Sequence, residues 1–380
     1  MSDQFRTQPF ASVSANAMGA ISRRRMLLGL SGSSALLGLA GCSGLALGGG
    51  DDLPRAGTIG KAALLAPLSG PRASIGQIMV AAASLGGNPT GPNAEVSVVD
   101  SGASNESAVI AARAALEGGA KMLLGPLFSG QSRAVADAVG RVVPVVALSN
   151  DSSIANGKLF VFGVTPQQSA RAIISFAATR GKRTIAVVVP PGQFGALSAA
   201  AARSVASGLG ITMPPPITTS SAAGLADMLR SAFGGALPDA VYLPVVSGPF
   251  EAQAAAIKAT GVQLLGSEQW ATITPYRIAA LRDGWFAAPD PVRFESFATA
   301  FEAEGQGEAG IVAGLAFDAV EMARILGRLG KQDRKGLLRD GGFDGVLGPY
   351  RFLESGQCER GLAVLSVAQG ATTLIGATTV

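Results

Sequence analysis

The sequence predicts an α/β protein built from two doubly wound lobes, each containing a parallel sheet with helices on both faces. From residue 58 onward, short apolar runs alternate with Ala-rich stretches of helical spacing. The alternation starts again near residue 166, which indicates two successive units of similar length. The apolar runs are nearly continuous in Val and Leu, as expected for parallel strands that are buried on both faces. A chain of 380 residues is long enough for two such lobes.

The first unit has clear start and stop signals. Ser104 and Ser107 open a helix with ordinary capping chemistry, and Gly118-Gly119 ends it. We predict strands over 59–67, 95–100, 121–125 and 142–148, and helices over 73–85, 104–117 and 129–141.

The second unit repeats this order, and later segments are shared between the lobes. We predict helices over 167–180, 194–209 and 248–260, and strands over 184–189, 240–246 and 262–265. A helix over 311–329 and a short one over 335–339 return to the first lobe, and strands around 346–352 and 362–367 close the second. The expected first lobe is therefore 58–165 plus about 289–341, and the second is 166–288 plus about 342–380.

Residues 1–41 have the features of a bacterial export signal. Ser22-Arg-Arg-Arg-Met-Leu-Leu28 is a twin-arginine pattern, and the apolar run after it is shorter than the roughly 20 residues that a spanning helix needs. Leu39-Ala-Gly-Cys42 resembles a lipobox, which implies that Cys42 is acylated and becomes the mature N-terminus. The alternative is an ordinary leader with a chance cysteine. Residues 42–57 then form a flexible tether.

The residue after the predicted lipidation site bears on localisation. In lipoproteins, Asp at this position is expected for retention at the inner membrane, whereas here the residue is Ser43. The resemblance therefore implies a periplasmic, lipid-anchored protein and favours the outer membrane over the inner one. With Cys42 acylated, Cys358 is the remaining thiol, and we expect it to be buried and structural.

The basic isoelectric point, about 9.3, does not indicate a nucleic-acid partner. The leader carries four arginines against one acid, Asp3, so most of the formal net charge of +4 belongs to it. The rest of the chain is nearly neutral, shows no basic stripe in sequence, and has few aromatic residues for stacking on bases.

Several kinds of catalytic and metal site are excluded or unsupported. The chain has no histidine, which removes Ser-His-Asp and Cys-His systems and the commonest zinc ligand sets. It contains no G-x-S-x-G and no C-x-x-C motif, and its acids show no evident catalytic pairing. We therefore expect a protein that is not an enzyme and that needs no cofactor or metal.

The segment Gly125-Pro-Leu-Phe-Ser-Gly-Gln-Ser132 has the glycine spacing of a phosphate-binding loop, but Gln131 replaces the lysine. An amide cannot neutralise phosphate charge, and no metal-holding acid ends the following strand. We interpret the segment as a strand-to-helix loop at the rim of a binding cleft, with Ser129 capping the next helix.

Six segments, in this order and spacing, resemble the type I periplasmic binding proteins of the leucine-binding family. They are LLAPLSGP (64–71), VDSG (99–102), LGP (124–126), PVVALSN (144–150), FGVTPQQ (162–168) and GVLGPYRF (345–352). The resemblance covers about residues 58–370. It implies two doubly wound parallel-sheet lobes with an inter-lobe cleft, in which a ligand binds at the carboxyl ends of the strands.

The resemblance also implies a set of ligand-binding residues. In members that bind amino acids, first-lobe hydroxyl and backbone groups hold the ligand carboxylate, and a second-lobe acid, here Glu268, takes the ammonium. This chain departs from the pattern at Pro244-Val-Val246, where amino-acid binders often have an aromatic residue. The first-lobe positions that correspond are Ser129, Gln131, Ser132, Ser149, Asn150 and Ser152.

Two functions are compatible with this resemblance and with the predicted lipid anchor. One is a regulatory lipoprotein similar to the penicillin-binding protein activators, whose partner would be a peptidoglycan synthase. The other is the substrate-binding component of an ABC importer, with a permease as partner and an amino acid or similar small polar ligand. Ser43, the absence of clear aromatic and charged ligand groups, and the loop 125–129 favour the activator at this point.

Overall fold

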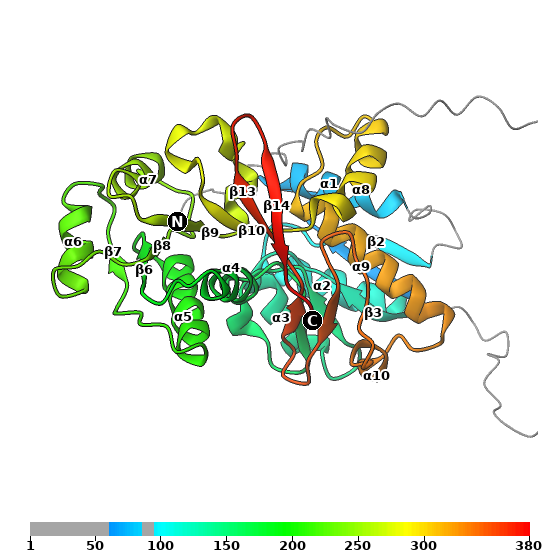
Figure 1. Cartoon of the computed structure of the whole chain (residues 1–380). Helices are drawn as coiled ribbons and strands as arrows, with labels where there is room; N and C mark the ends of the chain where they lie inside the picture. The colour runs from blue at the N-terminus through cyan, green and yellow to red at the C-terminus, as the bar shows by residue number, and fades with distance from the viewer. Residues whose placement is uncertain (1–60, 86–94) are drawn as a thin grey trace, which may run out of the picture.

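The computed structural model describes residues 61–85 and 95–380, which fold around two sheets (Figure 1). The export signal, Cys42 and the tether lie outside the described residues, so these assignments stay predictions. Within the described part of the chain, no helix is both long and apolar enough to cross a bilayer.

The first sheet contains five parallel strands in the order β2-β1-β3-β4-β5. The residues of β1 point alternately to its two faces: Leu64 belongs to the core under α1 and α9, and Leu65 to the core under α2 and α3. The strands are β1 (Lys61–Ala66), β2 (Val96–Asp100), β3 (Ala120–Leu124), β4 (Val145–Ala147) and β5 (Leu159–Val161), and the helices are α1 (Ala73–Ser84), α2 (Asn105–Glu117), α3 (Ser129–Val139) and α9 (Ile311–Arg328).

The second sheet has seven strands in the order β14-β13-β10-β9-β8-β6-β7. The five strands that come first along the chain are parallel: β6 (Ile185–Val189), β7 (Ile217–Thr218), β8 (Ala240–Tyr242), β9 (Gln263–Gly266) and β10 (Trp285–Ala288). The last two, β13 (Ala363–Val367) and β14 (Thr372–Ala377), are antiparallel. Helices α4 (Pro166–Thr179) and α5 (Gln193–Gly208) cover one face, and α6 (Leu225–Ala232) and α7 (Phe250–Lys258) cover the other.

Most of the predicted elements are present, with ends that shift by a few residues. The predicted start of α2 is confirmed, because the Ser104 hydroxyl accepts from the Ser107 amide and the Ser107 hydroxyl accepts from the Ser104 amide. The sequence did not show β5, β7, α6, β10, or helix α8 (Pro291–Ala303). These short or weakly patterned segments take their structure from the sheet or helix that they pack against. The lobe boundaries given above stay a prediction.

The prediction that a strand around 346–352 closes the second lobe is wrong. Residues of β11 (Tyr350–Phe352) pair instead with β12 (Cys358–Arg360) in a separate two-stranded sheet. This hairpin packs on the end of the first lobe, where the ring centroids of Phe162 and Tyr350 are 4.8 Å apart and those of Phe160 and Phe352 are 5.6 Å apart. Aromatic packing against β5, rather than strand pairing with the second sheet, therefore decides its position.

A buried ion pair joins this hairpin to α9. The Arg360 Nη1 atom lies 3.6 Å from Asp318 Oδ2, and both side chains are almost completely buried. The Arg360 guanidinium lies over the rings of Phe162 and Tyr350, 4.6 and 4.9 Å from their centroids. Asp318 also accepts from the backbone amide of Val346 at 2.7 Å. Burial raises the pKa of Asp318 to about 6, although the positive charge of Arg360 acts in the opposite direction.

Cys358 lies beside this ion pair, as a free thiol in the buried face of β12. Burial raises the pKa of its thiol to about 12, so the reactive thiolate is strongly disfavoured. The expectation that Cys358 is buried is confirmed, and its packing in the hairpin gives it a structural role.

We predict that Arg360→Gln destabilises the fold far more than Arg351→Gln, a matched change in the same hairpin. Loss of Arg360 leaves the Asp318 carboxylate buried without its cation, which costs about 3–5 kcal/mol. Arg351 pairs with Glu359 on the surface, where an ion pair contributes about 0–1 kcal/mol. Urea unfolding at about pH 8 measures both, and the Arg360→Gln cost should shrink at about pH 5, where Asp318 can protonate. Equal costs for the two variants would contradict the assignment.

Candidate functional site

The carboxyl edges of the two sheets face one another. Asp151 follows β4 in the first lobe, and Gln193 is the first residue of α5, directly after β6 in the second. The Gln193 Nε2 group donates to Asp151 Oδ2 at 3.5 Å, so the loops that follow these strands meet across the boundary between the lobes. In open α/β sheets, ligands bind outside the carboxyl ends of the strands, which makes this boundary the candidate site.

The loop 125–132 forms part of the first-lobe edge and is held by backbone contacts. Gly125 has a φ of 89°, and a side chain there would come within 2.6 Å of the Leu65 carbonyl oxygen. The Gln131 amide nitrogen donates to the carbonyls of Gly102 and Ser104, both at 3.1 Å. These bonds hold two neighbouring loops together through the Gln131 amide nitrogen, whereas the buried Gln131 Oε1 atom has no hydrogen-bond partner among the described residues.

Two serines of the same loop, Ser129 and Ser132, lie in the first turn of α3. The prediction that Ser129 caps α3 is wrong: the helix begins at Ser129, and Phe128 occupies the cap position without a side-chain hydrogen bond. Ser129 is half-buried at the edge. Ser132 is fully buried, and its hydroxyl donates to the carbonyl oxygens of Pro126 and Phe128, both at 3.0 Å.

The loop after β4 places three more of the predicted residues at this edge. The buried Ser149 hydroxyl accepts from the Asp151 amide at 3.1 Å and so shapes the turn. Asn150 and Ser152 are half-buried beside it. Ser152 also lines a cavity of about 160 Å³ between the first turn of α4 and β12, with Thr165, Gln168 and Arg171.

Several polar groups of that cavity already have partners. The Gln168 amide nitrogen donates to the Cys358 carbonyl at 2.6 Å, and Arg171 pairs with Glu359 at 2.7 Å. Gln168 and Thr165 also form the capping box at the start of α4. The cavity therefore lies within the connection between the lobes, and its side chains are used to hold that connection.

Glu268 lies in the second lobe, in the short helical segment Glu268–Thr272 after β9, and it is buried. Its Oε2 atom accepts a short hydrogen bond from the Ser169 hydroxyl of α4. Burial raises the pKa of Glu268 to about 7, against the lowering effect of the Ser169 hydrogen bond. The Glu268 carboxyl therefore holds a proton more readily than an exposed glutamate does, and it is hydrogen-bonded inside the lobe.

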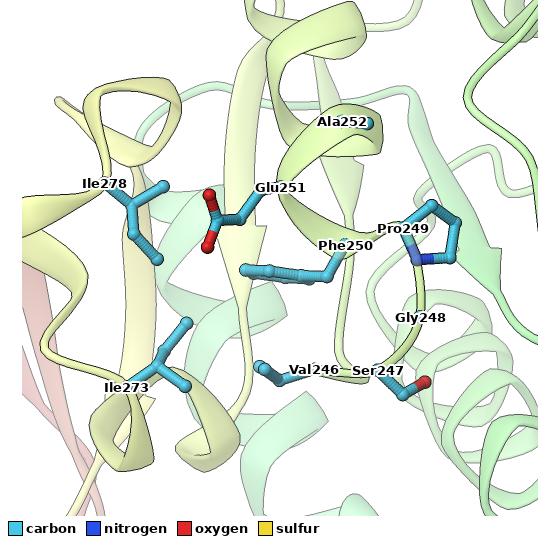
Figure 2. Close-up of a pocket in the computed structure, with 9 residues that line it drawn as sticks. All are labelled: Val246, Ser247, Gly248, Pro249, Phe250, Glu251, Ala252, Ile273 and Ile278. Atoms are coloured by element: carbon cyan, nitrogen blue, oxygen red, sulfur yellow. The ribbon is translucent and has the colours of Figure 1, made fainter.

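A second cavity, of about 270 Å³, lies at the carboxyl edge of the second sheet. It is formed by the loop after β8, the first turn of α7 and the segment 273–278 (Figure 2). Phe250, Ile273 and Ile278 point into this space, and the Glu251 carboxylate lies at its side. The cavity offers an apolar wall with one acid and with the backbone of Ser247 and Gly248.

Sequence reasoning missed several members of the site. Gln193 could have been found from Pro190-Pro-Gly192, which ends β6 and places the next residue at the carboxyl edge. Phe250, Ile273 and Ile278 carry no local signal, because apolar residues at a cavity resemble core residues in sequence. Pairing of Glu268 with Ser169, 99 positions away, had no signal either.

A comparison with protein-family models identifies the family. A model described as periplasmic binding protein matches residues 61–372. No curated protein sequence matches the chain.

Solved structures share the fold at low sequence identity. A putative branched-chain amino acid ABC transporter protein from Rhodospirillum rubrum is 20% identical with a TM-score of 0.69, covering 83% of this chain and 99% of its own. A substrate-binding protein from Sphaerobacter thermophilus is 20% identical with a TM-score of 0.63, covering 84% and 97%. A solute-binding protein from R. palustris in complex with 4-hydroxybenzoate is 17% identical with a TM-score of 0.57, also covering 84% and 97%.

These identities establish the fold alone, whereas the family match spans most of the chain and carries the assignment. The two α/β lobes with opposed carboxyl edges are the architecture that this family uses. The chain belongs to the periplasmic binding protein family.

Proposed function

We propose that this protein is the substrate-binding component of an ABC importer and works with a permease partner. The observation that carries the proposal is the meeting of the two carboxyl edges at Asp151 and Gln193, the place where open α/β sheets bind ligands. The structural neighbours are named as ABC transporter proteins, which supports the importer better than the activator of a penicillin-binding protein. Ser43, cited for the activator, lies outside the described residues.

The family implies a periplasmic location and a protein that binds ligands rather than transforming them. We further propose that lipid on Cys42 anchors the chain to a membrane, with Ser43 favouring the outer one. An importer component would have to reach an inner-membrane permease, so the membrane assignment depends on which partner is found.

The ligand that fits this site is a small carboxylate with an apolar body. In the first lobe, Ser129, Asn150 and Ser152 are half-buried at the edge and supply hydroxyl and amide groups. Gln131, Ser132 and Ser149 have internal partners and shape that edge instead. The second lobe offers the apolar wall shown in Figure 2. The ligands named for two neighbours, a branched-chain amino acid and 4-hydroxybenzoate, both have this chemistry.

Glu268 is poorly suited to bind the ammonium group of an amino-acid ligand. A carboxyl with a pKa of about 7 that accepts from Ser169 inside the lobe does not present a full negative charge to the cleft. We therefore propose that the ligand is recognised without an ammonium contact at Glu268, which favours aromatic or aliphatic carboxylates over amino acids.

Thermal unfolding of the full chain with added ligands tests the function. A ligand at about 100 times its Kd stabilises the folded state by about 2.7 kcal/mol. We expect saturable stabilisation by 4-hydroxybenzoate or a branched aliphatic carboxylate, and a weaker effect from leucine. Absence of stabilisation by all three, together with capture of a peptidoglycan synthase from membranes, would favour the activator.

Asn150→Ala and Ser152→Ala are each predicted to weaken binding of the ligand found in that screen. Loss of one hydrogen bond of about 0.5–1.5 kcal/mol lowers affinity about 2- to 10-fold. Ser207→Ala, an exposed change near the end of α5, is the control and should leave the affinity unchanged. Calorimetric titration measures all three, and unchanged affinity in both cleft variants would remove the loop after β4 from the site.

Glu268→Gln is predicted to change the pH dependence of stability and leave ligand affinity unchanged. Folding raises the pKa of Glu268 from 4.5 to about 7, so the folded protein binds this proton more tightly than the unfolded chain. The free energy of unfolding therefore increases as the pH falls from about 7 to about 4.5. The neutral Gln side chain should remove up to roughly 3 kcal/mol of this dependence and stabilise the protein at about pH 8. Urea unfolding at two pH values measures the effect, with Glu295→Gln, an exposed change on α8, as the control. A large loss of affinity would instead restore Glu268 to the ligand site.

A further inference from the structure

The opposite edge of the first lobe, where its strands begin, collects basic side chains. Because the strands of this sheet are parallel, their amino ends share one edge. The end of α9 reaches the same edge, since Arg328 contacts Glu95 just before β2. Six exposed cations lie there: Lys61, Lys121, Arg141, Lys158, Arg328 and Lys331.

Two exposed apolar side chains lie among these cations. Val142 is 73% exposed next to Arg141, and Leu329 is 45% exposed next to Arg328. Transfer of such exposed apolar side chains from water into an apolar phase is favourable in free energy. Basic groups with neighbouring exposed apolar groups are the combination found on surfaces that lie in a membrane interface.

Acids at this edge offset part of the basic charge. Glu95 already contacts both Arg324 and Arg328. Asp333 caps the short helix α10 (Arg334–Leu337) by accepting from the Gly336 amide at 2.8 Å. Glu117 and Glu354 are exposed nearby, so the cations still outnumber the acids.

The position of β1 ties this edge to the N-terminal segment. Lys61 begins β1, so the chain that precedes it leaves the first lobe from the basic edge. Cys42 lies 19 positions earlier, which an extended chain spans in at most about 65 Å. An anchor at Cys42 would therefore leave this edge within reach of the membrane.

We propose that this edge is a docking surface for an anionic lipid headgroup layer, which orients the anchored protein with its cleft away from the bilayer. The proposal rests in part on the proposed lipidation of Cys42. Arg328 lies in the last turn of α9, where a cation complements the carboxyl end of the helix. Lys61, Lys121 and Lys158 stand at strand starts, where no helix end accounts for them.

Vesicle binding by the unacylated full chain, carrying Cys42→Ser, tests the surface directly. The expected result is binding to phosphatidylcholine vesicles with about 30% phosphatidylglycerol at about 0.05 M salt, with release at about 0.5 M as screening shortens the Debye length. Pure phosphatidylcholine should bind far less. The triple variant Lys121→Gln, Arg141→Gln, Lys158→Gln should bind about 10- to 100-fold more weakly, since each basic residue near the surface contributes.

A matched control distinguishes an effect of this edge from an effect of the net charge of the protein. Arg183→Gln, Arg203→Gln and Arg277→Gln remove three exposed cations from the second lobe and should leave vesicle binding unchanged. A second variant, Val142→Gln with Leu329→Gln, keeps the charge and should also weaken binding.

Equal losses in the two triple variants, or no binding to anionic vesicles, would overturn the proposal. Binding only to native membranes that contain protein would assign the edge to a protein partner and overturn it as well. The stabilisation of the edge variants by an added ligand is measured in parallel. This measurement distinguishes a failure of the proposed ligand-binding function from a failure of the proposed lipid docking.

Discussion

The connection between the lobes depends on the buried pair of Arg360 and Asp318. Asp318 is in α9 of the first lobe, and Arg360 is in a hairpin that follows it in the chain. The Arg360 guanidinium also donates to the Phe162 carbonyl at 3.1 Å, just before the chain crosses into α4. Burying two charges is costly, so the pair is stable only while its neighbours keep their positions. Tying α9, the hairpin and the crossover together makes these segments one unit.

This constraint explains why the candidate cleft is where it is. The crossover at 162–165 runs directly from the buried pair to the capping box of α4, and α4 packs against α5, whose first residue is Gln193. Movement of the connection would therefore carry Gln193 toward or away from Asp151.

The two edges of the first lobe have different chemistry because its strands are parallel. All carboxyl ends lie on one side, where Ser129, Asn150 and Ser152 offer neutral polar groups. All amino ends lie on the other, where lysines at strand starts gather with Arg141 and with Arg328 at the end of α9. A single sheet direction thus separates a neutral polar edge from a basic edge, which an antiparallel sheet would mix.

The sequence by itself determined the fold class and most of the local structure. Continuous apolar runs, helical spacing and the Ser104 cap are local signals, and they act within a few residues. Only the tertiary structure decided the pairing of β11 with β12, the burial of Glu268 against Ser169, and the internal hydrogen bonds of Gln131. The basic edge is another case, since its cations are spread from position 61 to 331 and form no stripe in sequence. Each of these depends on contacts between distant residues, which no local pattern encodes.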